Sequence, residues 1–231
     1  MQIFCAGLPG MKLFHTPAIS ALAARILVAE SGLPVRPVRV RLNSGLDEDG
    51  QDFRATYPDC RLPALWFDDE TLLDTETDMA LALLARMSPH PVTAPLPDMP
   101  AFQQIRMCLK FLAHDVHVHF SPLLRLDTLA PARSAAHEAL QRAYAQLDAM
   151  LARQSFLLGE AFTLPDAYAF TLLTWNPLAG LDTATWPALA AYAGRIRQRP
   201  SVMAALAEEG LLEGWRDDLQ PCSGCDPSRR A

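Results

Sequence analysis

The chain has 231 residues, of which 50% are hydrophobic and 20% charged, a composition typical of folded globular proteins rather than disordered ones. The 20 basic and 26 acidic residues give a net charge of −6, which argues against nucleic acid as a partner, since binding phosphates requires a basic excess. The longest apolar stretch, residues 18–29, is interrupted by Arg25 and is too short to span a bilayer. Because the 5 cysteines form no disulfide framework and the N-terminus lacks a basic signal region, we expect a cytoplasmic protein without membrane contact.

Prolines divide the chain into two parts. Five of them crowd the segment before residue 101, which lacks helical periodicity and is predicted to be a stiff connector. The expected organisation is an N-terminal extension at 1–10, a first domain at 11–87, a proline-rich linker at 88–100, an all-helical domain at 101–215 and a flexible tail at 216–231.

The first domain alternates short strand-like and helix-like segments. A helix with Leu22, Ile26 and Ala29 on one face is predicted to end at Gly32, a residue suited to the left-handed cap position. A variant capping box at residues 75–78 starts a second helix. Period-two or short apolar runs predict strands at residues 11–14, 38–42, 64–67 and 71–73. The order βαβ followed by ββα predicts a small α/β domain.

Nearly every segment of the second domain has helical periodicity. Apolar residues spaced i, i+4, i+7 and i+11 from Ile105 to Val116 predict a long amphipathic helix. Thr163, Pro165 and Asp166 form the start signal of another helix, before an apolar run. Further helices are predicted at residues 134–151, 186–197 and 201–206.

Specific strings, in this order and spacing, resemble the glutathione transferase superfamily. They are Leu62-Pro63-Ala64-Leu65, Thr75-Glu76-Thr77 and FLLGEAFTLPDAYAF at residues 156–170. The start MKLFHTP, Glu30-Ser31-Gly32, His117 within DVHVHFSPLLR, Trp175 and RPSVMAALAEEGL are similar to the bacterial beta class. The resemblance extends from Met11 to about Leu212. It implies an α/β thioredoxin-like N-terminal domain, an all-α C-terminal domain, a homodimer and a glutathione site between the domains.

The resemblance also implies which residues bind glutathione. Leu62 would pair its backbone with the cysteinyl unit, before a cis Pro63. Glu76 and Thr77, at a helix start that favours anions, would take the ammonium and the carboxylate of the γ-glutamyl end. Lys110 is near the position of a contact residue that the partner subunit supplies in this class, and its charge could substitute for the lysine missing after Leu42. The alternatives are a strand-initiating Pro63, a simple helix cap at residues 75–78 and a solvated Lys110.

The sequence departs from the beta-class pattern where the glutathione sulfur would lie. The usual cysteine is matched by Ser20 and the usual tyrosine by His15, and the loop after Leu42 lacks the usual lysine. A serine hydroxyl near a helix N-terminus can donate to a thiolate and favour its ionisation, but it cannot form a mixed disulfide. Ser20 is therefore predicted to be a catalytic residue, with a plain N-cap as the alternative.

Three histidines within HxxHxH need a separate interpretation. His114 and His117 are three residues apart, as in some metal sites, but no carboxylate or cysteine completes a ligand set, so we expect no metal. The resemblance implies that His117 is a catalytic residue that lines the glutathione and acceptor site. It also implies that His15 and Trp175 lie in the substrate pocket. The CxxC at Cys222 and Cys225 lies in the polar tail and is not expected to be a redox centre.

The sequence thus predicts an enzyme, a glutathione transferase that conjugates the thiolate of glutathione, its co-substrate, to small hydrophobic electrophiles. Two alternatives stay open. One is a binding or regulatory protein of this fold that has lost catalysis. The other is a glutathione-dependent dehalogenase or isomerase using the same site.

Overall fold

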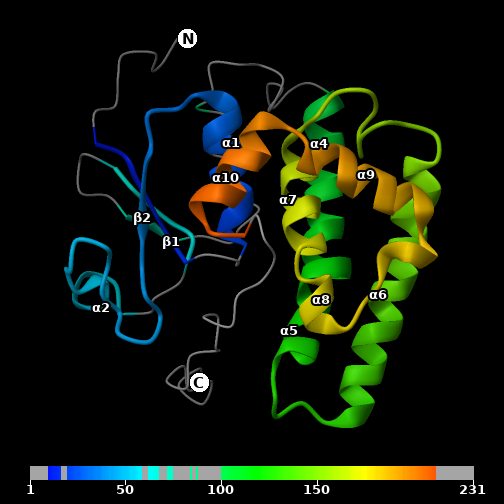
Figure 1. Cartoon of the computed structure of the whole chain (residues 1–231), viewed down its shortest axis with the longest axis horizontal. Coiled ribbons are helices and arrows are strands. Elements are labelled where there is room, and N and C mark those ends of the chain that lie inside the picture. The colour runs from blue at the N-terminus through cyan, green and yellow to red at the C-terminus, as the bar shows by residue number, and fades with distance from the viewer. Residues whose placement is uncertain are drawn as a thin grey trace.

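The computed structural model describes residues 10–16, 20–58, 62–67, 72–74, 84, 87 and 100–211. An α/β part lies beside a larger helical part, and helix α10 (Pro200–Glu208) returns from the helical part to lie against α1 (Ala21–Ser31) of the α/β part (Figure 1). The expected fold, a thioredoxin-like domain followed by an all-α domain, is confirmed.

A four-stranded mixed sheet with the order β2-β1-β3-β4 organises the first domain. β1 pairs with β2 in parallel and with β3 antiparallel, and β3 pairs with β4 antiparallel. The strands are β1 (Lys12–His15), β2 (Arg36–Arg39), β3 (Ala64–Trp66) and β4 (Leu72–Asp74). The predicted hairpin is therefore present as β3 and β4.

Side chains of the central strands alternate between two cores. Leu13 and Leu65 pack with the apolar residues of α1 into the main core. Phe14 and Ala64 point to the other face, where they pack with Phe53 of the short helix α2 (Phe53–Thr56). The sheet is thus covered on both faces, and α1 is held between the sheet and the helical domain.

Two predictions for this domain need correction. The second strand is Arg36–Arg39 instead of residues 38–42, because the chain turns at residues 42–44 and Gly45 adopts a φ of 73°. Helix α2 was not predicted, although Asp52 caps it by accepting hydrogen bonds from Arg54 N–H and Ala55 N–H at 2.9 and 3.2 Å. Most of the predicted helix that follows residue 75 lies outside the described residues.

The second domain is helical throughout its described residues. Helix α7 lies at its centre, and all ten of its residues are buried. The helices are α4 (Pro100–Phe111), the π-helix η1 (Leu112–His117), α5 (Val118–Leu124), α6 (Ala130–Leu151), α7 (Leu164–Leu173), α8 (Asn176–Ala179), the 3₁₀-helix η2 (Thr183–Thr185), α9 (Pro187–Arg197) and α10.

The predicted start signal of α7 is a complete capping box. Asp166 Oδ2 accepts hydrogen bonds from the N–H and the hydroxyl of Thr163 at 2.7 and 2.8 Å, and Oδ1 accepts from Leu157 N–H and the Tyr192 hydroxyl, both at 2.9 Å. A fully buried carboxylate is stable only when its oxygens are hydrogen-bonded in this way. These bonds fix α7, which carries residues of the candidate site described below.

The long amphipathic helix predicted from Ile105 to Val116 is present but not uniform. Its last turns widen into the π-helix η1, in which Val118 N–H donates to the carbonyl of Ala113. The spacing of the apolar residues does not reveal this, because the buried Leu112 and Val116 also fit an α-helical stripe. π-turns inside helices are frequent at functional sites.

Charged side chains join the two domains at the contact of α1 with α10. Arg25 on α1 donates a hydrogen bond to Glu208 on α10. Farther along α1, Glu30 accepts hydrogen bonds from Arg199 and Ser201, at the start of α10. These bonds set the position of α1, and of the residue before it, relative to the helical domain. Among the described helices, none is long and apolar enough to cross a membrane.

Candidate active site

One end of the sheet brings together residues predicted to bind glutathione. The antiparallel register pairs Phe14 with Ala64, so Leu62 and Pro63 lie beside the chain as it leaves β1 toward Ser20. The Leu62–Pro63 peptide bond is cis, as expected, and the half-buried Leu62 precedes the buried Pro63. The backbone of Leu62 thus lies just before β3, a central strand between β1 and β4, at one end of the sheet.

Ser20 occupies the N-cap position of α1, with 6% of its surface exposed. Its side chain makes no capping hydrogen bond to the first turn, although its carbonyl accepts from Ala23 N–H at 3.2 Å. A simple N-cap role for the hydroxyl, the alternative considered from the sequence, is therefore not what the structure shows. Ser20 is placed at the positive end of an 11-residue helix that has no acidic side chain in its first turn.

Glu76 and Thr77 lie outside the described residues. The last described residue before them is Asp74, which pairs with Ala64 at the same end of the sheet as Leu62 and Pro63. Their predicted contacts with the γ-glutamyl end of glutathione stay predictions.

His117 lies in a cluster of aromatic side chains on the helical domain. Its Nδ1 is 2.6 Å from the hydroxyl of Tyr168, and its ring meets the Trp175 ring edge-on with 5.1 Å between centroids. Phe120 contacts the other side of Trp175 at 5.3 Å. Burial lowers the pKa of His117, so its imidazole is neutral near pH 7. The predicted pair of His117 and Trp175 is therefore in contact, at the end of η1 and just after α7.

His15 lies in the domain junction, not beside His117. Its ring is 4% exposed, and its Nε2 accepts a hydrogen bond from Arg25 at 2.9 Å. Its Nδ1 lies 3.6 Å from Glu209 Oε1, just beyond α10. Desolvation, followed by the charges of Arg25 and Arg39, lowers the pKa of His15 to about 3. At 3.6 Å from Glu209, Nδ1 has no hydrogen-bond partner within the described residues. The predicted role of His15 in the substrate pocket stays a prediction.

The remaining predicted positions are on the surface of the helical domain. Lys110 is exposed at the end of α4. His114 is exposed while His117 is half-buried, and the wider π-helical turn between them separates two side chains that an α-helix would place on one face. Within the described part of the chain, no group of three or more His, Cys, Asp or Glu side chains could hold a metal ion. Cys222 and Cys225 lie outside that part.

Two important side chains were not predicted from the sequence. Arg25 was noted only as an interruption of an apolar stretch, yet a lone charge on a buried helix requires a partner. Tyr168 was noted only as part of a family-like string. Because α7 ends at Leu173, before Trp175, helical spacing does not relate the two side chains, and no local signal in the sequence identifies Tyr168.

Comparisons with known proteins agree with this architecture. The N-terminal domain model of glutathione S-transferase matches residues 9–77, and the C-terminal domain model matches residues 78–200. Glutathione S-transferase GstA of Escherichia coli O157:H7 is 34% identical over 202 residues, covering 87% of this chain and 100% of the relative.

Solved structures give the same result. A sphingomonad glutathione S-transferase complexed with glutathione is 37% identical with a TM-score of 0.80, and the match covers 87% of this chain and 99% of the other. The bacterial beta class enzyme of Sphingomonas chungbukensis is 35% identical with a TM-score of 0.80, covering 87% of this chain and 100% of the other. The chain belongs to the glutathione S-transferase family and resembles its bacterial beta class.

Proposed function

We propose that this protein is a glutathione transferase that joins the thiolate of glutathione to small apolar electrophiles. The observation that carries the proposal is the end of the sheet, where Leu62 and Pro63 precede β3 next to the end of β1, together with Ser20 at the start of α1. The complex of the similar sphingomonad protein with glutathione supports glutathione as co-substrate. In this proposal the protein acts in the cytoplasm, the compartment expected from its composition.

In this function the first domain binds glutathione and holds its sulfur. Leu62 pairs with the cysteinyl backbone, and Glu76 and Thr77 bind the γ-glutamyl end. The sulfur then lies near Ser20, the N-cap residue of α1. A hydrogen bond from the Ser20 hydroxyl, together with the helix dipole, stabilises the thiolate over the thiol. Attack on a bound electrophile then forms the carbon–sulfur bond while the leaving group departs.

The second domain supplies the acceptor site. The half-buried, neutral His117 would face the electrophile, and the buried rings of Trp175 and Phe120 pack behind it as apolar support. Desolvation by such walls strengthens the electrostatic interactions at the reacting atoms. This composition supports small, mostly apolar acceptors as the substrate class.

A non-catalytic binding protein is the second candidate. Ser20 and His15 stand where the beta-class pattern has cysteine and tyrosine, and the structure commits His15 to Arg25 instead of to a ligand. Such a protein would bind glutathione without lowering the pKa of its thiol.

Retention on immobilised glutathione, followed by turnover with a chloro-nitro-aromatic acceptor, separates the two candidates. Retention with turnover supports the transferase, and retention without turnover supports the binding protein. Loss of both contradicts the glutathione site itself. Glu76→Ala should weaken glutathione binding by about 1.5–3 kcal/mol in calorimetry, because a charge-assisted hydrogen bond is lost.

Variants at Ser20 test the catalytic assignment. Ser20→Ala should lower turnover and leave glutathione affinity nearly unchanged, and Ser20→Cys should form a mixed disulfide visible by intact-mass measurement. The matched control is Ser31→Ala, which changes a buried serine at the other end of the same helix. Equal turnover of Ser20→Ala and the wild type would remove Ser20 from the mechanism.

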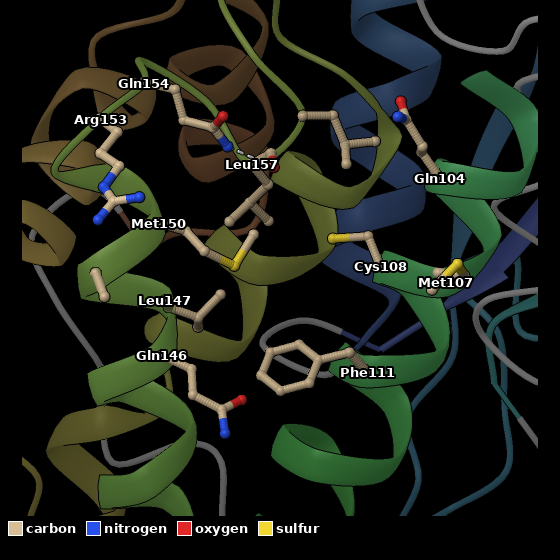
Figure 2. Close-up of a pocket in the computed structure, with 12 residues that line it drawn as sticks. Gln104, Met107, Cys108, Phe111, Gln146, Leu147, Met150, Arg153, Gln154 and Leu157 are labelled. Carbon is tan, nitrogen blue, oxygen red and sulfur yellow. Dashed lines mark hydrogen bonds between the residues drawn. The ribbon is translucent and has the colours of Figure 1, made fainter. Parts of the chain in front are cut away.

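The second partner in the proposal is another copy of this chain. A groove of about 710 Å³ lies between α4 and α6, and Phe111 and Leu147 face each other across it (Figure 2). On its rims, Met107 is 73% and Met150 is 40% exposed. Lys110 is one turn from Met107, so a copy seated on this groove would meet the lysine that the family resemblance assigns to the partner's glutathione site.

Sedimentation of substituted chains tests this dimer. Met107→Glu should shift the protein toward monomers, because it introduces a charge into an apolar contact. Met203→Glu, at an exposed methionine of α10, should not. A wild-type chain that sediments as a monomer at all concentrations would contradict the homodimer.

A further inference from the structure

We propose that Tyr168 is a positioning residue that holds His117 with its ring proton on Nε2, so that His117 presents an N–H donor to the reacting groups. This inference rests on the proposed transferase function for its chemistry, but the state of the His117 ring can be observed without any substrate.

The contact is between a fixed phenol and a partly accessible imidazole. Tyr168 is 1% exposed on α7, whose first turn is fixed by the Asp166 capping box. Its hydroxyl lies 2.6 Å from Nδ1 of His117, and the two rings meet at 85° with centroids 5.9 Å apart. A hydrogen bond of this length to a buried phenol restricts both the position and the rotation of the imidazole.

The direction of this hydrogen bond follows from the acidity of the two groups. A phenol is the better donor, and the unprotonated nitrogen of a neutral imidazole is the better acceptor. His117 is neutral because burial lowers its pKa. The Tyr168 hydroxyl therefore donates to Nδ1, and the single proton of the ring is on Nε2.

The Nε2 edge is the part of His117 that remains for chemistry. Tyr168 covers the Nδ1 edge and Trp175 covers one side of the ring, yet His117 is only half-buried. Nε2 is not among the buried polar atoms that lack a hydrogen-bond partner in the described part of the chain, which supports an accessible edge away from Tyr168. An N–H at that edge can donate to a thiolate or to a leaving group that gains negative charge, without the cost of burying a full positive charge.

Nitrogen-15 NMR of the ligand-free protein, labelled at histidine, tests the inference. In the wild type near pH 7 we expect His117 as the Nε2–H tautomer. Tyr168→Phe keeps the ring and removes the hydroxyl, so the spectrum should show a mixture of tautomers. Tyr144→Phe is the matched control, because it removes another buried hydroxyl, which donates to Asn176 at 2.5 Å, and should leave the His117 signals unchanged.

Kinetics provide the second measurement. Tyr168→Phe should lower kcat roughly two- to tenfold, the range expected from one hydrogen bond, with little change in the KM for glutathione. Tyr144→Phe should retain wild-type kcat at a temperature where both variants are folded.

A wild-type spectrum showing the Nδ1–H tautomer or the imidazolium form would overturn the inference, even if Tyr168→Phe failed to fold. An unchanged tautomer in a folded Tyr168→Phe variant would also overturn it. Failure of the transferase proposal is distinguishable, because absence of wild-type turnover leaves these spectra unaffected.

Discussion

His15 and His117 are both buried to a large extent and both have a lowered pKa, yet their surroundings differ. His15 lies among charges at the domain junction, with Arg25 on one ring nitrogen and Glu209 facing the other. His117 lies among aromatic rings, and within the described part of the chain its Nδ1 has the Tyr168 hydroxyl as its hydrogen-bond partner. The comparison shows that burial alone does not make a histidine functional. The ring nitrogen that structural contacts leave available decides what the residue can do.

The same comparison separates stability from catalysis. The residues around His15, namely Arg25, Glu208 and Glu209, contribute to the contact of α1 with α10. Changes there should alter the free energy of unfolding. His117, with Tyr168 and Trp175 in contact with it, supports the proposed acceptor site. Changes there should alter turnover more than the free energy of unfolding. Four predictions test this division.

The largest expected effect is the loss of stability in acid that His15 causes. Its folded pKa of about 3 is below the ordinary value of 6.5, so the unfolded chain binds the proton more readily. This contribution to stability is complete above about pH 6.5 and falls by about 1.4 kcal/mol per pH unit as the pH drops toward 3. Denaturant unfolding at pH 7 and 4.5 should therefore differ by roughly 2–3 kcal/mol from this group alone.

His15→Gln is the comparison for that measurement. Its amide can still accept from Arg25 and donate toward Glu209, but it cannot take up a proton. The variant should lose clearly less stability than the wild type over the same pH interval. Parallel pH profiles for the two proteins would show that His15 is not buried as described.

Removal of Arg25 should have the next largest effect. Arg25→Met deletes the donor to His15 and the bond to Glu208, and should lower the free energy of unfolding by about 2 kcal/mol. The control is Arg36→Met, because Arg36 is 53% exposed and pairs with Asp49 on the surface. Such a surface pair contributes at most about 1 kcal/mol. Equal losses for both variants would contradict a structural role for the buried cluster.

Substitution of His117 should affect turnover more than stability, the opposite of the changes near His15. His117→Phe keeps an aromatic ring against Trp175 but removes both nitrogens, so turnover should fall about tenfold, equivalent to about 1.4 kcal/mol. Stability should fall by about 1 kcal/mol, because the Tyr168 hydroxyl loses its acceptor. Paired kinetics and denaturant unfolding give both values. Wild-type turnover in this variant would remove His117 from the site.

The smallest expected effect concerns the acceptor pocket wall. Trp175→Phe keeps an aromatic side chain but reduces the surface next to His117 and Phe120. We expect the KM for an aromatic acceptor to rise about two- to fivefold, while the affinity for glutathione stays the same. A change in the affinity for glutathione, with an unchanged KM for the acceptor, would place Trp175 in the glutathione-binding part of the site.

Local signals predicted much of the fold. Gly32 ends α1 with a φ of 64°, and its N–H donates to Val28 as a left-handed cap should. Thr163 and Asp166 form the capping box that their spacing indicated. Both features depend on a few neighbouring residues, so the sequence contains them directly.

Features that depend on distant residues could not be predicted in this way. Arg25 meets Glu208 across 183 residues of chain, and Tyr168 meets His117 across 51. The family resemblance predicts roles for Ser20, His117 and His15 from position alone, and a matching position does not specify which groups surround a new side chain. Only the packing of α1 against α10 shows that His15 accepts from Arg25 and lies near Glu209.

The central claim is that Ser20 and the start of α1 activate the thiol of bound glutathione. Ultraviolet difference titration of the thiolate in the enzyme complex measures this directly. We predict a thiol pKa below the ordinary value of about 8.5 in the wild type, and a rise of about one unit, or about 1.4 kcal/mol, in Ser20→Ala. A bound thiol that titrates like free glutathione in the wild type, with no change in Ser20→Ala, would contradict the account.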